Sequence, residues 1–141
     1  MGANGEANAE RLATKIRSRG QLLLCKGCCC GKTERGLPEV PVDRIKAAWK
    51  ADKLNKTIQL TISGCLGPCD LPNVAVVVSR EGTTWLGNLA GDAHYEALIA
   101  WARASTAAGD VLPMPDELDS YRFERFAETS GRGNSTPDPV P

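Results

Sequence analysis

The sequence predicts an α/β fold with the element order β-α-β-β-β-α and a small mixed sheet. Two short stretches, 21–25 and 57–63, have the patterns of strands and flank a segment with helical spacing. Two further strand-like stretches and a second helical segment follow between residues 74 and 109. A parallel β-α-β unit followed by a hairpin and a covering helix builds a sheet with helices packed on it.

Apolar spacing predicts the first strand and the first helix. Residues 21–25 form an apolar run of strand length. A helix is expected to begin near Pro41, because proline is tolerated in a first helical turn. Apolar side chains then recur near helical spacing, at Val42, Ile45, Ala48, Trp49 and Leu54.

Three more strands and a second helix complete the core. Residues 57–63 alternate strictly between apolar and polar side chains, and 74–78 form a valine-rich run, so both predict strands. A turn signal at Glu81 and Gly82, followed by 83–86, predicts a hairpin. The second helix is expected to be capped by Asp92, to expose His94 in its first turn, to stop near Gly109, and to bury Tyr95, Leu98, Ile99, Trp101 and Ala102.

The chain of 141 residues has the length of one domain, flanked by polar extensions. Residues 1–20 are a polar arm or helix, and 21–110 form the core domain. Residues 111–127 contain Tyr121, Phe123 and Phe126, which are expected to pack on the domain or bind a partner. Residues 128–141 are rich in Gly, Ser, Pro and Asp and predict a disordered tail.

The charge balance of the sequence limits the classes of partner that are expected. Seventeen basic and seventeen acidic residues give a net charge of zero, so neither nucleic acid nor an anionic membrane is an expected partner. The sequence also lacks the apolar run of a signal peptide or a membrane span, which predicts a cytoplasmic protein. In a reducing compartment, its six cysteines are expected to be metal ligands or catalytic thiols rather than disulfides.

The cysteines form two groups, each in a loop after a predicted parallel strand. Four lie within residues 25–30, and Cys65 and Cys69 lie in the loop after 57–63, where Gly67 and Pro68 let the chain fold back. Loops at the carboxyl ends of parallel strands share one edge of the sheet, so the two groups are expected to meet. Four thiolates suit iron-sulfur or zinc ligation.

Other interpretations of the first group stay open. A thiol-disulfide oxidoreductase would use Cys25 and Cys28 and would need a helix directly after them, which Pro38 and Pro41 delay. A trafficking protein for metal or iron-sulfur clusters would explain surplus thiols. A phosphate-binding loop is disfavoured, because 27–33 (GCCCGKT) has three residues between its glycines where that loop needs four.

The stretch that contains the second cysteine group resembles a motif of known proteins. The stretch GCLGPCDLPNVAVVV resembles the second cysteine motif of thioredoxin-like 2Fe-2S ferredoxins and of the small 2Fe-2S subunit of respiratory NADH dehydrogenases. The spacing of that subunit's first motif is similar to the four residues between Cys25 and Cys30. The resemblance implies a thioredoxin-like fold and a 2Fe-2S cluster ligated by Cys25, Cys30, Cys65 and Cys69, with Cys28 and Cys29 outside the pattern.

A single-electron carrier is the function that this resemblance implies. No acid-base or nucleophile-base pair is apparent, so the protein is not expected to be an enzyme. Its partners would be redox proteins, and ferredoxins of this kind often pair as homodimers. Lys26, Lys32 and Arg35 lie near the first cysteines; such charges are usually just solvated, but here they could instead raise the reduction potential or form a docking surface.

Overall fold

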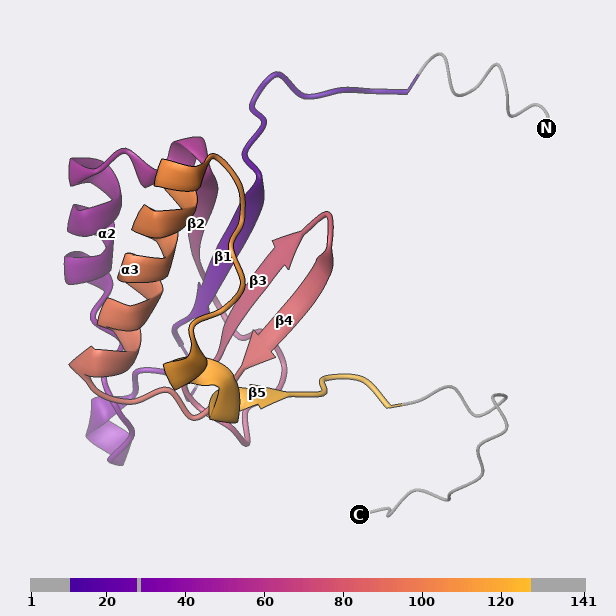
Figure 1. The fold of residues 1–141 in the computed structure, drawn as a ribbon. Helices are drawn as coiled ribbons and strands as arrows, with labels where there is room; N and C mark the ends of the chain where they lie inside the picture. The colour runs from indigo at the N-terminus through magenta and orange to yellow at the C-terminus, as the bar shows by residue number, and fades with distance from the viewer. Residues whose placement is uncertain (1–10, 28, 128–141) are drawn as a thin grey trace.

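The computed structural model describes residues 11–27 and 29–127 and confirms the predicted order β-α-β-β-β-α (Figure 1). A short fifth strand and three 3-10 helices, none of them predicted, are added to this core. The elements are β1 (Gly20–Cys25), η1 (Thr33–Arg35), α2 (Val42–Ala51), η2 (Leu54–Lys56), β2 (Ile58–Ser63), β3 (Ala75–Ser79), β4 (Gly82–Leu86), α3 (Asp92–Ala108), η3 (Asp116–Tyr121) and β5 (Arg122–Phe123).

The strands form one mixed sheet in the order β2-β1-β3-β4-β5. β1 pairs in parallel with β2, and the other neighbours are antiparallel. The parallel pair is joined through α2, and the β3–β4 hairpin extends the sheet on the other side of β1. A parallel β-α-β unit joined to a hairpin and a covering helix is the thioredoxin-like arrangement.

Helices α2 and α3 lie on one face of the sheet (Figure 1). The core lies between the sheet and these two helices. Alternate strand residues such as Leu22 and Leu24 point to the helix-covered face and are at most 1% exposed. Trp49 of α2 is also buried, and its indole N–H donates a 2.8 Å hydrogen bond to the carbonyl of Ile58. This bond ties the first helix to the start of β2 and satisfies a buried donor.

The start of α3 differs from the expectation. The residue before the first helical turn is Gly91, at φ 86°, and no side chain caps the helix there, so the predicted cap by Asp92 is wrong. Asp92 is instead the first helical residue, where its charge still complements the helix dipole. His94 is half-buried rather than solvent-facing: its Nδ1 accepts the Ala90 N–H at 2.9 Å, and its ring lies 4.4 Å from that of Tyr121.

The segment after α3 returns to the sheet. η3 places the chain so that β5 pairs with the end of β4, with Phe123 opposite Trp85 and Arg122 opposite Leu86. Residues 11–19 contain no helix; the rest of the predicted arm and the predicted tail at 128–141 lie outside the described residues. No helix within 11–27 and 29–127 is long and apolar enough to cross a bilayer.

Candidate metal centre

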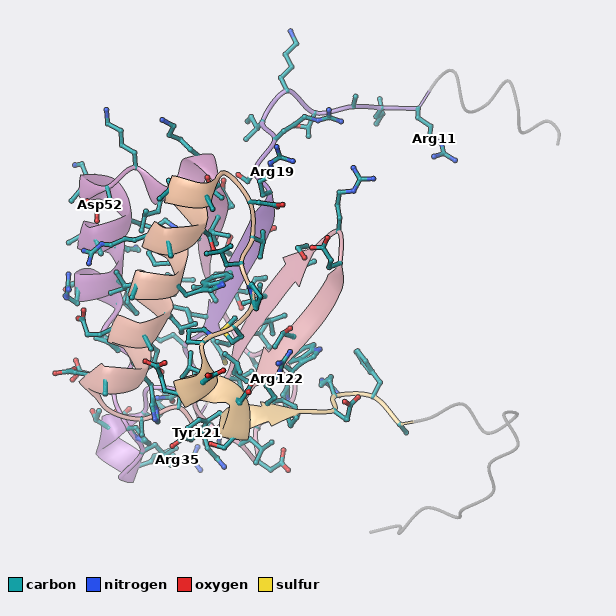
Figure 2. All side chains as sticks on the ribbon, viewed as in Figure 1. Arg11, Arg19, Arg35, Asp52, Tyr121 and Arg122 are labelled. Atoms are coloured by element: carbon teal, nitrogen blue, oxygen red, sulfur yellow. The ribbon has the colours of Figure 1, made fainter. Side chains whose placement is uncertain are left out.

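Both cysteine groups lie at the edge of the sheet where β1 and β2 end. Cys25 is the last residue of β1 and stands opposite Ser63, the last residue of β2, in the parallel register. Cys65 follows Ser63 after one glycine. Figure 2 shows Arg35, which comes from the first cysteine loop, at this end of the molecule, and Arg19, which precedes β1, at the opposite end. The parallel pairing thus brings together residues that are far apart in the sequence.

Five cysteines line one small pocket at this edge. The free space inside it is about 10 Å³, roughly what one water molecule needs, so the pocket is too small to be a substrate cleft. Cys28 lies outside the described residues. The pocket is lined by Cys25, Cys29, Cys30, Cys65 and Cys69, together with Leu66, Gly67, Pro68 and Val74.

The first cysteine pair is buried. Cys25 and Cys30 are 4% and 2% exposed, and their side chains are hydrogen-bonded to each other. The Val74 N–H donates to the Cys30 sulfur at 3.4 Å. Burial, and then the hydrogen bond with Cys25, raise the pKa of Cys30 to about 12. The loop folds back through the Gly27 N–H, which donates to the Cys30 carbonyl at 3.0 Å.

The second pair is exposed and close together. The sulfurs of Cys65 and Cys69 are 3.3 Å apart, because the chain reverses at Gly67, whose φ of 118° favours glycine. The Gly67 N–H donates to the Cys65 sulfur at 3.3 Å. Hydrogen bonds from Cys69 and from Gly67, and then the charge of Arg125, lower the pKa of Cys65.

The donor set fits a group that is ligated at two ends. The sulfurs face one pocket as two pairs, one from each cysteine loop. Among the residues described, no three Cys, His, Asp or Glu side chains gather around one point as they would around a single ion. A 2Fe-2S cluster takes four cysteine thiolates for its two irons, which is two for each iron, so two facing pairs match its needs.

Asn73 holds the loops around this site, and the sequence analysis did not find it. Its side chain is fully buried; Oδ1 accepts the Gly31 N–H at 2.7 Å, and Nδ2 donates to the carbonyls of Pro38 at 3.0 Å and Glu39 at 3.4 Å. The buried hydroxyl of Tyr95 is hydrogen-bonded to it as well. The only signal in the sequence is an amide directly before an apolar strand, which usually marks a turn.

Positive side chains approach both cysteine loops. Arg35, which the sequence analysis noted, has its Nη1 3.5 Å from the Cys29 sulfur, while Lys32 pairs with Glu34 at 3.6 Å on the surface. Arg125 contacts the second loop at Gly67. Sequence reasoning missed Arg125 because nothing local connects the segment after η3 with the loop after β2.

The likeness of the chain to known proteins is weak. No family model and no curated protein matches the chain. Among solved structures, the thioredoxin-like 2Fe-2S ferredoxin from Aquifex aeolicus is similar at 14% identity and a TM-score of 0.41, over 77% of this chain and 100% of that one. The function proposed below therefore rests on the cysteine geometry and not on this likeness.

Proposed function

We propose that the protein is a single-electron carrier that holds one 2Fe-2S cluster through Cys25, Cys30, Cys65 and Cys69. One observation carries the proposal: two cysteine pairs, delivered by the ends of two parallel strands, face one small pocket. When bound, the cluster takes up and releases one electron. The protein's residues hold it, shield one side of it and leave the other side accessible.

The two pairs have different environments, which suits electron exchange from one side. Cys25 and Cys30 lie in the core, whereas Cys65 and Cys69 are exposed. Backbone N–H groups point at sulfur in both pairs, from Val74 to Cys30 and from Gly67 to Cys65. Such N–H donors stabilise negative charge on sulfur and so raise a cluster's potential. The exposed pair would be the side from which electrons leave.

Burial supports Cys30 over Cys29 as the second ligand. Cys30 is enclosed, shares a hydrogen bond with Cys25 and receives the Val74 N–H. Cys29 is half-buried and contacts Arg35. We therefore assign Cys29 to the surroundings of the cluster, where Arg35 adds positive charge.

The remaining functional expectations follow from this proposal. A carrier needs no substrate cleft, so we propose a protein that is not an enzyme and that works with redox partner proteins in the cytoplasm, alone or as a homodimer. The thiol-disulfide oxidoreductase is less well supported. Cys25 is only 4% exposed, and α2 begins at Val42, well beyond the position from which a helix could activate it.

Anaerobic reduction tests this function. Titration with dithionite should reduce the protein with about one electron per chain and partly bleach its visible absorption, because a 2Fe-2S cluster stores one electron. Oxidised cytochrome c added afterwards should restore the colour at equal stoichiometry. A Cys65→Ser, Cys69→Ser double variant is the control and should take up none. A wild-type protein that accepts no electrons, or that accepts two and converts a disulfide into two thiols, would rule out the proposal.

A further inference from the structure

We infer that Arg125 is a positioning residue for the Cys65–Cys69 loop: it anchors the loop to the sheet and fixes a positive charge beside the exposed cysteine pair. The inference rests on the proposed function for the effect of that charge, whereas the anchoring stands on contacts alone. Through Arg125, the segment after η3 becomes part of the candidate metal centre.

Two aromatic rings fix the Arg125 guanidinium in place. Its central carbon lies 5.4 Å from the centre of the Trp85 ring and 4.9 Å from that of Phe126. Both distances are within the range of cation–π attraction, and arginine also stacks on aromatic faces. Trp85 and Phe126 themselves meet edge to face, with ring centres 6.1 Å apart. An otherwise flexible side chain is thereby held in one orientation.

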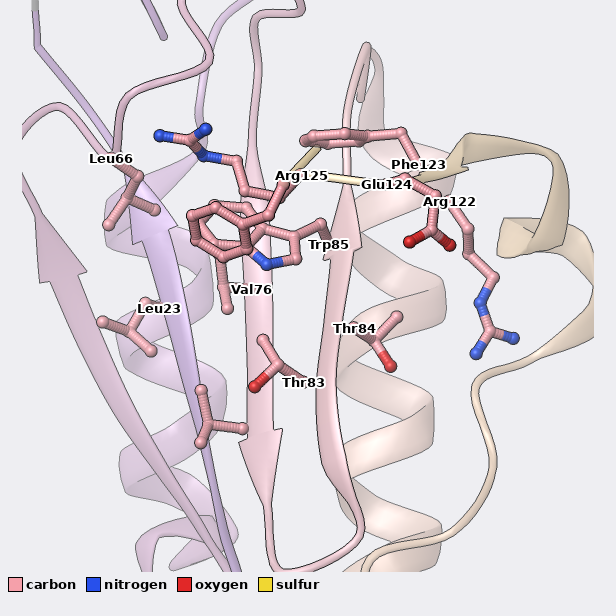
Figure 3. Close-up of a pocket in the computed structure, with 12 residues that line it drawn as sticks. Leu23, Leu66, Val76, Thr83, Thr84, Trp85, Arg122, Phe123, Glu124 and Arg125 are labelled. Carbon is pink, nitrogen blue, oxygen red and sulfur yellow. The ribbon is translucent and has the colours of Figure 1, made fainter. Parts of the chain in front are cut away.

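The guanidinium is directed at the second cysteine loop. Figure 3 shows Arg125 above Trp85, on the side of the groove where Leu66 lies, whereas Arg122 points the opposite way. A Cβ atom on Gly67 would collide with Nη2 of Arg125 and would lie 3.3 Å from its Cζ. The close approach therefore requires glycine at position 67 for space as well as for its φ of 118°.

The contact between Arg125 and the second cysteine loop connects the cysteine pocket with a groove on the sheet. A groove of about 890 Å³ runs over the sheet face opposite the helices, and its lining includes Trp85, Phe126 and Arg125. Leu66, between the two exposed cysteines in the chain, lines both this groove and the cysteine pocket. Nε of Arg125 is buried and has no hydrogen-bond partner among the residues described, so stacking and charge rather than a hydrogen bond at Nε hold the side chain.

A fixed positive charge at this place has a defined electrostatic effect. Reduction adds one negative charge to a group held by Cys65 and Cys69, and a nearby cation stabilises the reduced form. Water reaches the exposed pair and screens the interaction. We therefore expect removal of the Arg125 charge to lower the reduction potential modestly.

Hydrogen exchange tests the anchoring without any cluster. In the full-length protein treated with chelator, Arg125→Gln should speed amide exchange across residues 65–69 by about tenfold, because the loop loses its contact with the sheet. Arg122→Gln is the matched control: Arg122 pairs with Asp119 at 3.2 Å on the surface and should leave exchange in the loop unchanged. Equal exchange in the wild type and Arg125→Gln would overturn the anchoring.

The reduction potential tests the charge. Arg125→Gln should shift the reduced-to-oxidised ratio at a given potential by about three- to tenfold toward the oxidised form, and tenfold corresponds to about 59 mV for one electron. Arg125→Lys keeps the charge and should stay near the wild type, which a purely structural role does not predict. A potential that is the same in all three proteins would overturn the charge effect. A chain without a cluster would refute the proposed function, and the exchange result would still decide the anchoring.

Discussion

Replacing Cys30 with serine is expected to remove most of the iron and of the visible absorption. The Cys30 sulfur is enclosed beside Cys25 and Val74, so water has little room to replace it as a ligand. Serine is also a much poorer ligand for iron in sulfur-rich sites. The measurement is the iron content and visible spectrum of anaerobically purified protein, with circular dichroism to show that the variant folds.

Cys29→Ser is the matched control, one position away. It should keep the wild-type spectrum, because Cys29 is half-buried rather than enclosed and its sulfur lies 3.5 Å from Nη1 of Arg35. Cys28→Ser should do the same. If Cys28→Ser or Cys29→Ser alone bleaches the protein, the assignment of the second ligand is wrong. If no single substitution among the three has an effect, neighbouring thiols replace one another, and the trafficking function gains support.

Asn73→Ala is expected to cost about 3 kcal/mol of unfolding free energy. The substitution leaves the half-buried Gly31 N–H and Pro38 carbonyl without their partners, and a buried group left unsatisfied costs about 1–3 kcal/mol. The first cysteine loop loses its anchor at the same time, so a bound cluster should also be released faster to a chelator. Urea unfolding, with and without prior removal of metal, measures the loss.

Asn55→Ala is the control for the loss of unfolding free energy expected from Asn73→Ala. Asn55 also accepts a backbone N–H, from Leu60 at 2.9 Å, but it does so at the surface, where water can replace it. Its loss should cost about 1 kcal/mol or less. Equal effects at the two positions would mean that the network around Asn73 contributes no more than an exposed hydrogen bond.

The sequence was sufficient to predict the elements in which apolar side chains recur in a regular pattern. Alternation in 57–63 and the valine run before the hairpin predicted two strands, and apolar side chains at helical spacing predicted both helices, because burying one face of an element imposes these periods. β5 was not predictable in this way. A strand of two residues has no period, and it forms because Phe123 stands beside Trp85 across the sheet.

The same distinction applies to the candidate site: one part of it could be predicted from the sequence, and the other part is visible only in the fold. That the two cysteine groups meet follows from parallel strands, since their carboxyl ends share an edge. The choice between Cys29 and Cys30 depends on which side chain turns inward, and spacing alone does not determine that. Asn73 and Arg125 act across long stretches of chain, so their roles are visible only after the fold has placed their partners beside them.

The iron and acid-labile sulfide content of anaerobically purified protein, measured together with its visible spectrum, tests the central claim most directly. We expect about two irons and two sulfides per chain, a red-brown colour and charge-transfer bands, because the proposed site holds one 2Fe-2S cluster through four cysteine thiolates. A colourless protein that contains zinc would contradict the claim. Four irons per chain would contradict the cluster type and leave ligation by cysteine standing.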